Sequence, residues 1–212
     1  LAKMGWRDIV VIEQGRLFDT GGSTSHSPGL IFQSNPSKTM TEFAKQSVEL
    51  YKDLEVDGRP TFNQVGSLEV AWTPERWEDL KRKAGFARSW GLDPALLSAG
   101  EAMEKVPILT DRTIGAVYMP TDGVASAVPA TQAMGEAAQQ LDTTFYPRTT
   151  VTSIDVKDGR VQGVVTDRGR IHTETIVAAA GIWGPVIGRM AGVSIPLVPM
   201  EHLYVETGPL SE

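Results

Sequence analysis

A small, polar stretch near the start of the sequence carries one of its three histidines. It reads GGSTSHSPGL over residues 21–30, and it contains His26. Gly21 and Gly22 allow a close approach of the backbone or a positive φ. The hydroxyls of residues 23–25 stand among backbone N–H groups, a combination that suits phosphate oxygens. The stretch predicts either a loop that lies against a phosphate-bearing ligand or an ordinary surface turn with a solvated histidine.

An acidic residue closes the apolar stretch before this loop. Residues 1–4 predict the last turn of a helix, Gly5 its C-terminal cap and residues 8–12 a buried strand. Glu13 then stands where a dinucleotide-binding βαβ unit carries the acid for a ribose hydroxyl. The glycine-rich turn of such a unit would precede residue 1, so we expect an internal piece of a larger protein. The alternative is an ordinary parallel strand that ends in an exposed acid.

Composition and charge exclude several classes of function. The chain has 212 residues, of which 41% are hydrophobic, enough for one large domain or two interleaved ones. The net charge of −6 and the scattered basic residues argue against a nucleic-acid partner. Without cysteine, and with distant histidines, we expect no metal site. No apolar run approaches the roughly 20 residues of a membrane span. We therefore expect no membrane association and a cytoplasmic protein, or a mitochondrial matrix protein in a eukaryote.

The middle of the chain predicts alternating helices and strands. Helix starts are marked by the signal Asn35-Pro36-Ser37, the cap residue Thr73 and the Ser98/Glu101 capping box. The expected helices cover about 40–54, 74–90, 99–106 and 127–141, and the expected strands cover 62–73 and 113–123.

Residues 144–181 change to short strands separated by the turn sequences KDGR and DRGR. The apolar run Ile176–Ala180 predicts a parallel strand, and Gly181 after it would let the chain pass close to a cofactor. A meander of three strands that leads into such a strand is typical of FAD-dependent Rossmann domains, although meanders also occur elsewhere.

The order of these segments resembles the dimethylglycine oxidases and dehydrogenases and the sarcosine dehydrogenases, flavoproteins of the D-amino-acid-oxidase superfamily. The resemblance runs along nearly the whole chain and includes QSNPSKTM, FNQVGSLEVA, DLKRK and PTDGVASA. It implies an α/β fold in which a Rossmann-like FAD-binding domain of the glutathione-reductase type is interleaved with a substrate domain on a mixed or antiparallel sheet. The implied FAD-binding parts are 1–35, without the first strand and glycine turn, and 121–192. The implied substrate-domain parts are 36–120 and an incomplete strand region at 193–212.

The resemblance also implies roles for individual residues around FAD. His26 would be bonded covalently to the 8α-methyl group of the flavin, which makes the flavin a stronger oxidant. Val151 would turn its backbone to the adenine and Trp183 would contact the cofactor, although ordinary core packing suits both residues as well. The full set expected to bind the cofactor is Glu13, Gln14, Gly22, Ser23, Thr24, Ser25, His26, Ser27, Pro28, Gly29, Leu30, Val151, Gly181 and Trp183.

Two residues near the end of the sequence are the expected catalytic pair. His202 matches a histidine of the family's substrate cavity, where it would orient the amine or assist its deprotonation. Tyr204 lies two residues further on the expected strand MEHLYVET and could line the same cavity. A structural role is the alternative for each. His172 has no counterpart in the family, and we expect it on the surface.

The implied reaction is the oxidative N-demethylation of an N-methylated glycine such as dimethylglycine or sarcosine, by hydride transfer to the flavin. The electron acceptor would be oxygen or an electron-transfer flavoprotein. Tetrahydrofolate would bind only to a further region of the full-length protein, and we expect this piece to be inactive alone.

Three alternatives remain. One is a catalytically silent relative that acts as a regulatory or interaction subunit. The presence of His26 and His202 argues against this alternative. The others are another amino-acid oxidase of the superfamily and a nicotinamide-dependent dehydrogenase, which has no use for the His26 loop.

Overall fold

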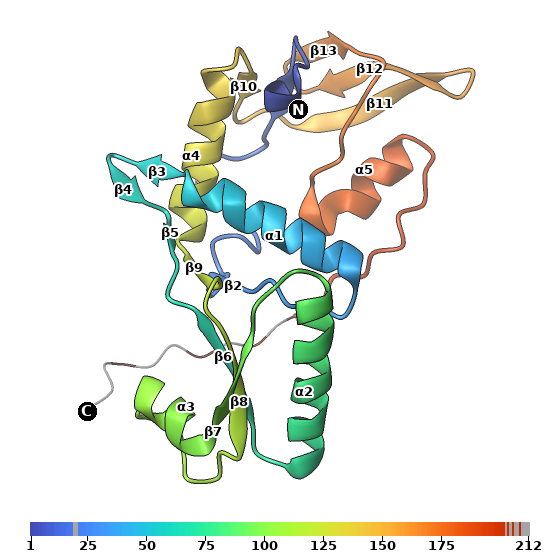
Figure 1. The fold of residues 1–212 in the computed structure, drawn as a ribbon. Coiled ribbons are helices and arrows are strands. Elements are labelled where there is room, and N and C mark those ends of the chain that lie inside the picture. Colours follow the sequence, from blue (N-terminus) through green and yellow to red (C-terminus); the bar gives the residue numbers. More distant parts are fainter. Residues whose placement is uncertain (19–20, 202, 204, 206–207, 209–212) are drawn as a thin grey trace. The chain divides into compact units, whose positions relative to one another are not determined.

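Two compact units alternate along the chain in the computed structural model, which describes residues 1–18, 21–201, 203, 205 and 208 (Figure 1). Unit 1 consists of Leu1–His26 and Gly135–Ser211, and unit 2 of Ser27–Met134. The alternation agrees with the interleaved α/β organisation expected from the sequence. The assignment of an FAD-binding and a substrate domain, with limits at 35, 120 and 192, stays a prediction.

Unit 2 contains an antiparallel sheet with the strand order β6–β8–β7. Helix α2 packs along this sheet, because its apolar side chains recur on one face (Figure 1). The Thr73 hydroxyl accepts a hydrogen bond from the Arg76 backbone N–H, and Pro74 occupies the first turn, so α2 begins where the sequence predicts. The bounds are β6 (Ser67–Ala71), α2 (Pro74–Ser89), β7 (Ala95–Ser98) and β8 (Gly115–Met119).

Helix α3 (Ala99–Lys105) follows β7 and begins with the expected capping box. The Ser98 hydroxyl accepts from the Glu101 backbone N–H, and the Glu101 carboxylate accepts from the Ser98 N–H. Hydrogen bonds from the hydroxyl and the N–H of Ser98 hold the pKa of Glu101 below its usual value. The helix therefore starts at the position that the sequence predicts.

A second sheet of unit 2 has the order β2–β9–β5 and is antiparallel throughout. Helix α1 covers it with Val48, which packs with Phe62 and Ala125. The bounds are β2 (Leu30–Ile31), α1 (Lys38–Lys52), the hairpin β3 (Glu55–Val56) and β4 (Arg59–Pro60), β5 (Phe62–Asn63) and β9 (Gly123–Ala125).

Unit 1 combines a parallel strand pair, β1 with β10, and an antiparallel meander in the order β11–β12–β13. Helix α4 begins in unit 2 and ends in unit 1. The bounds are η1 (Ala2–Met4), β1 (Val10–Ile12), α4 (Ala127–Gln139), β10 (Thr144–Tyr146), β11 (Val151–Lys157), β12 (Arg160–Thr166), β13 (Gly169–His172), η2 (Gly181–Trp183) and α5 (Gly184–Met190).

Several expectations need correction. The strand expected at 8–12 begins only at Val10, because Asp8 has a φ of 54°. The strand expected at 62–73 is divided into β5 and β6 around Gly66, whose φ is 79°. The run Ile176–Ala180 is not a strand. A strand needs a neighbour for its backbone N–H and C=O groups, and within the described part of the chain no segment pairs with this run.

No helix among the described residues is long and apolar enough to cross a membrane.

Replacement of Leu80 tests the packing of α2 on its sheet. Leu80 is fully buried among Ala71, Ala84 and Val117, with Trp77 beside them. We expect Leu80→Ala to lower the free energy of unfolding by about 2–5 kcal/mol, because it removes buried methyl groups and leaves a cavity. Urea unfolding followed by tryptophan fluorescence measures the loss. The control Leu96→Ala, at a side chain that is 38% exposed, should cost clearly less. Equal losses would contradict this account of the core.

Candidate functional site

Glu13 directly follows β1, and its backbone continues the pairing with the segment after β10. The Glu13 N–H donates to the Tyr146 carbonyl at 3.0 Å, and the Thr149 N–H donates to the Glu13 carbonyl at 2.9 Å. The carboxylate oxygen Oε1 accepts the N–H of Gly15 at 2.6 Å. Glu13 and Gln14 are both exposed. The structure thus presents an acid at the carboxyl end of a parallel strand, where an acceptor for ribose hydroxyls is expected.

The loop that contains His26 is a hydrogen-bonded turn. The His26 N–H donates to the Ser23 carbonyl at 3.3 Å, and the Ser25 hydroxyl donates to the Gly22 carbonyl at 3.0 Å. Nδ1 of His26 lies 2.9 Å from the same carbonyl oxygen. A carbonyl only accepts hydrogen bonds, so this contact requires a hydrogen on Nδ1. The side chains of Ser23, Thr24, Ser25 and His26 are exposed.

Trp183 lies beside this loop. A Cβ atom on Gly22 would stand 3.8 Å from the Trp183 ring, so the indole is in van der Waals range of the loop backbone. Trp183 closes η2, which opens at Gly181 with a φ of 51°. Trp183 is 47% exposed, and the choice between cofactor contact and core packing stays a prediction. The structure therefore brings together the expected cofactor residues Gly22 and Trp183.

Val151 begins β11 and is half-buried. It stands two residues after Thr149, whose N–H bonds to Glu13, so the start of the meander is tied to the end of β1. Its proposed turn toward an adenine stays a prediction.

The last part of the expected loop, residues 27–30, belongs to unit 2. The Ser27 hydroxyl accepts the Gly29 N–H at 3.2 Å. Gly29 has a φ of 77° and is so close to the Ala125 carbonyl that a Cβ atom has no room. Ser27, Pro28 and Leu30 are exposed.

The expected catalytic residues His202 and Tyr204 lie outside the described residues. Of the expected strand around them, Met200, Glu201, Leu203 and Val205 are not in a strand. His172, on β13, is exposed, as expected. In the described part of the chain, no group of histidine, aspartate and glutamate side chains gathers to hold a metal ion.

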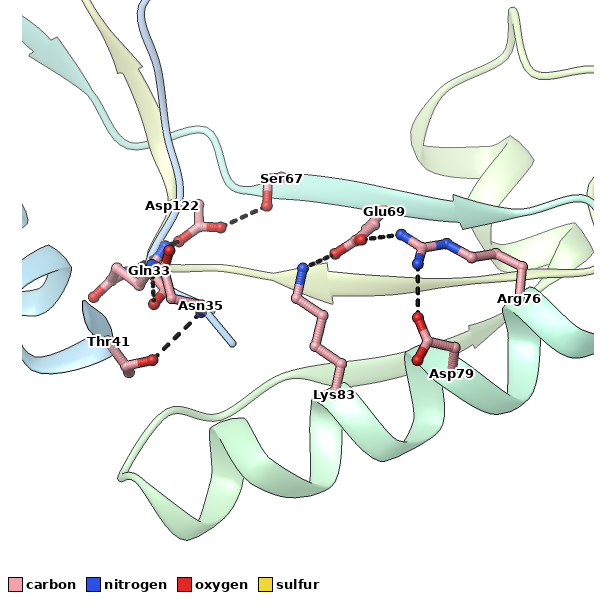
Figure 2. Close-up of polar contacts among 9 residues, drawn as sticks. All are labelled: Gln33, Asn35, Thr41, Ser67, Glu69, Arg76, Asp79, Lys83 and Asp122. Carbon is pink, nitrogen blue, oxygen red and sulfur yellow. Dashed lines mark hydrogen bonds and ion pairs between the residues drawn. The ribbon is translucent and has the colours of Figure 1, made fainter. Parts of the chain in front are cut away.

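Asp122 is the most deeply buried carboxyl group among the described residues, at 1% exposed, and it was not predicted from the sequence. Its signal was present in the segment PTDGVASA, but an aspartate before glycine is common in turns. Figure 2 shows that it bonds with Gln33 and Ser67, which are far away in the sequence.

The described arrangement suits a dinucleotide that carries a redox-active ring. Glu13 offers an acceptor for a ribose diol. The turn offers the backbone N–H groups of residues 22–25 and the hydroxyls of Ser23 and Thr24 for a pyrophosphate. His26 adds an exposed imidazole ring to this turn.

The comparisons with known proteins agree with this chemistry. Over residues 1–212 the chain matches the family model "FAD dependent oxidoreductase". Three relatives are the pyruvate dehydrogenase phosphatase regulatory subunit of Mus musculus (36% identical, 99% of this chain), dimethylglycine dehydrogenase of Rattus norvegicus (31%, 100%) and sarcosine dehydrogenase of Homo sapiens (32%, 98%). The names of all three call them mitochondrial.

The chain spans 23–25% of the length of these relatives. Among solved structures, L-proline dehydrogenase from P. horikoshii is similar with a TM-score of 0.83 and 29% identity, over 91% of this chain and 51% of that chain. The match to the family model extends over the whole sequence. The chain therefore belongs to the family of FAD-dependent oxidoreductases.

Proposed function

We propose that the protein that carries this chain oxidises an N-methylated glycine such as dimethylglycine or sarcosine and removes a methyl group. The observation that carries this proposal is the His26 turn, in which Nδ1 bonds to the Gly22 carbonyl while Trp183 flanks Gly22. The relatives named for dimethylglycine and sarcosine support the substrate class.

The residues of unit 1 fit FAD. Glu13 would accept hydrogen bonds from the adenosine ribose, and the N–H groups of residues 22–25 would bind the pyrophosphate. Trp183 would line the side of the site next to Gly22 and exclude water there. FAD, when bound, supplies an acceptor for the hydride of the C–H bond next to the amine nitrogen.

His26 is the proposed point of covalent attachment. Nε2, the ring nitrogen that does not bond to the Gly22 carbonyl, would form the bond to the 8α-methyl carbon. Such an attachment would replace one methyl hydrogen and the Nδ1 hydrogen, both lost as protons, and would need a two-electron oxidant, for which oxygen or an electron-transfer flavoprotein would serve. The Gly22 carbonyl orients the ring for this bond.

His202 and Tyr204 are the proposed residues on the substrate side. His202 would hold the amine in its neutral form by accepting its proton, because only a neutral amine has the nitrogen lone pair that assists loss of the hydride. Tyr204 would line the same cavity. A folate that accepts the released one-carbon unit would require a further region of the protein. In a eukaryote we propose the mitochondrial matrix, since the names of the three relatives call them mitochondrial.

A second candidate is a regulatory subunit without catalytic activity. The 36% identity to the pyruvate dehydrogenase phosphatase regulatory subunit favours it. It predicts that no N-methylated glycine reduces a bound flavin, so the experiments below separate the two functions.

Replacement of His26 tests the covalent bond. We expect the unmodified protein to keep its yellow colour after acid precipitation, and a tryptic peptide with His26 to carry the mass of FAD. His26→Ala should release its flavin on denaturation and lower the reduction potential, because the electron-withdrawing imidazole is lost. His172→Ala, at an exposed histidine of the same unit, is the matched control. Loss of all flavin from the unmodified protein would refute the covalent bond.

A comparison of three amines tests the substrate class. Dimethylglycine and sarcosine should each reduce the flavin at least about tenfold faster than D-alanine, because a methyl group that fills an apolar pocket is worth about 1–3 kcal/mol. Anaerobic stopped-flow absorbance gives the rates. Faster reduction by D-alanine would assign the protein to another amino-acid oxidase, and no reduction by any amine would favour the regulatory subunit.

Replacement of His202 tests its role in proton transfer. His202→Ala should slow reduction per bound flavin by roughly 10²–10⁴-fold, the contribution typical of a general base. The flavin content should stay unchanged, since His202 is not proposed to bind the cofactor. If the residue only stabilises the fold, the yield of folded protein will fall while the rate per flavin stays normal.

A further inference from the structure

A pocket lies on the face of the β6–β8–β7 sheet that α2 leaves free. Val117 of β8 packs in the core beneath α2. Neighbouring residues of a strand point to opposite faces, so Tyr118 points away from α2, and Leu68 of β6 is its partner in the register. Helix α3 packs against β7 and β8 and ends at Lys105, which contacts Tyr118 (Figure 1). All of these residues belong to unit 2.

The pocket is small and opens to solvent. Its walls are formed by residues 65–68, Tyr118, Lys105 and Val106, and its volume is about 220 Å³. Pockets for drug-sized ligands have volumes of about 300–1,000 Å³, so this one suits a smaller molecule. The side chains of Val65, Leu68 and Val106 make much of the wall apolar.

Lys105 supplies a positive charge at the pocket. Its Nζ lies 4.2 Å from the centroid of the Tyr118 ring, within the range of a cation–π interaction. Among the described residues, no carboxylate forms an ion pair with Lys105. Glu101, one turn earlier in α3, accepts hydrogen bonds from Ser98 instead. The ring thus holds the ammonium group at the pocket without neutralising it, so its charge is available to an anion.

The Tyr118 hydroxyl is a second donor at the pocket. The ring lies against Gly66, where a Cβ atom would stand 2.5 Å from a ring carbon and 2.7 Å from the hydroxyl oxygen. The absence of a side chain at Gly66 therefore makes room for the ring. In the part of the chain that the structure describes, no hydrogen bond engages this hydroxyl. It can donate its hydrogen to a ligand.

Other polar groups of the wall already have partners within unit 2. The Gly66 N–H donates to the Asp122 carbonyl at 2.8 Å, and the Val106 N–H donates to the Ala102 carbonyl at 3.0 Å. The Ser67 hydroxyl donates to the Asp122 carboxylate at 2.6 Å. A ligand therefore meets one ammonium group, one phenol hydroxyl and apolar side chains.

We propose that this pocket binds a small carboxylate with a single negative charge and a compact apolar part. The carboxylate accepts hydrogen bonds from the Lys105 ammonium group and the Tyr118 hydroxyl, so its charge matches the single cation. The apolar part contacts Val65, Leu68 and Val106. Inorganic phosphate has no apolar part for this wall. The inference goes beyond the proposed function, because it involves neither the flavin nor any residue of unit 1.

Protection of Lys105 from chemical modification tests the site. Benzoate is the probe, because it combines one carboxylate with a compact apolar ring, and benzamide is its neutral counterpart. Brief reductive methylation followed by mass spectrometry of peptides gives the labelling rate of each lysine. Benzoate should slow the labelling of Lys105 severalfold, because a bound carboxylate occupies the ammonium group, and benzamide should leave the rate unchanged.

Lys81 is the internal control in the same unit. Its Nζ also lies near an aromatic ring, 5.8 Å from the centroid of the Trp77 ring, but it already pairs with Glu78. Its labelling should be the same with and without benzoate. Equal protection of the two lysines, or no protection of Lys105, would overturn the proposal. Inorganic phosphate at the same ionic strength should protect Lys105 less than benzoate, and equal protection would show a general anion site instead.

Replacement of the hydroxyl tests the second donor. In Tyr118→Phe the ring stays beside Gly66, and the benzoate concentration that protects half of Lys105 should rise severalfold, because one hydrogen bond to the carboxylate is lost. Tyr51→Phe, at a half-buried tyrosine of the same unit, is the matched control and should leave this concentration unchanged. An unchanged concentration in Tyr118→Phe would contradict the proposed geometry. Because the assay reads Lys105 itself, its result does not depend on whether the protein oxidises an amine.

Discussion

Gly29 approaches the carbonyl oxygen of Ala125 so closely that no side chain fits between the two backbones. This approach allows β2 to pair with β9, whose other edge pairs with β5. Gly123 in β9 is under the same restriction, because a Cβ atom there would meet the Asn63 carbonyl and the Phe62 ring. With β9 in place, Ala125 contributes to the core beneath α1. The organisation of this half of unit 2 depends on two positions that only glycine can occupy without a shift of the neighbouring backbone.

Local patterns in the sequence predict the helices well. Ser37, Thr73 and Ser98 each accept a backbone N–H bond at a helix start, as their positions indicate. In each case the capping side chain and the N–H group that it accepts are three residues apart. Both partners of the hydrogen bond therefore lie in one short segment of the sequence. The turns of the meander are predictable for the same reason, since Asp158 and Gly159 both have the positive φ that a tight hairpin requires.

Interactions between distant segments were not predictable in the same way. The bond from Gln33 to Asp122 joins residues in separate motifs, and neither motif indicates its partner. The run Ile176–Ala180 has the composition of a buried strand, but strand formation depends on a neighbour that composition does not reveal. For the site, the sequence indicated Glu13, the His26 loop and Trp183. It did not indicate that Nδ1 of His26 bonds to Gly22, because side-chain direction depends on the folded turn.

The parallel pair of β1 and β10 has a consequence for biosynthesis. Val10 pairs with Thr144, so the whole of unit 2 lies between the two partners in the sequence. A nascent chain therefore releases β1 from the ribosome long before its partner exists, whereas the strands of unit 2 find all their partners within unit 2. Closure of so long a loop is entropically costly and slow. Until then the apolar strand VVI has an unpaired edge. A substitution that slows the folding of unit 2 would prolong this exposure. It would promote aggregation of the nascent chain, even where the folded protein tolerates the substitution.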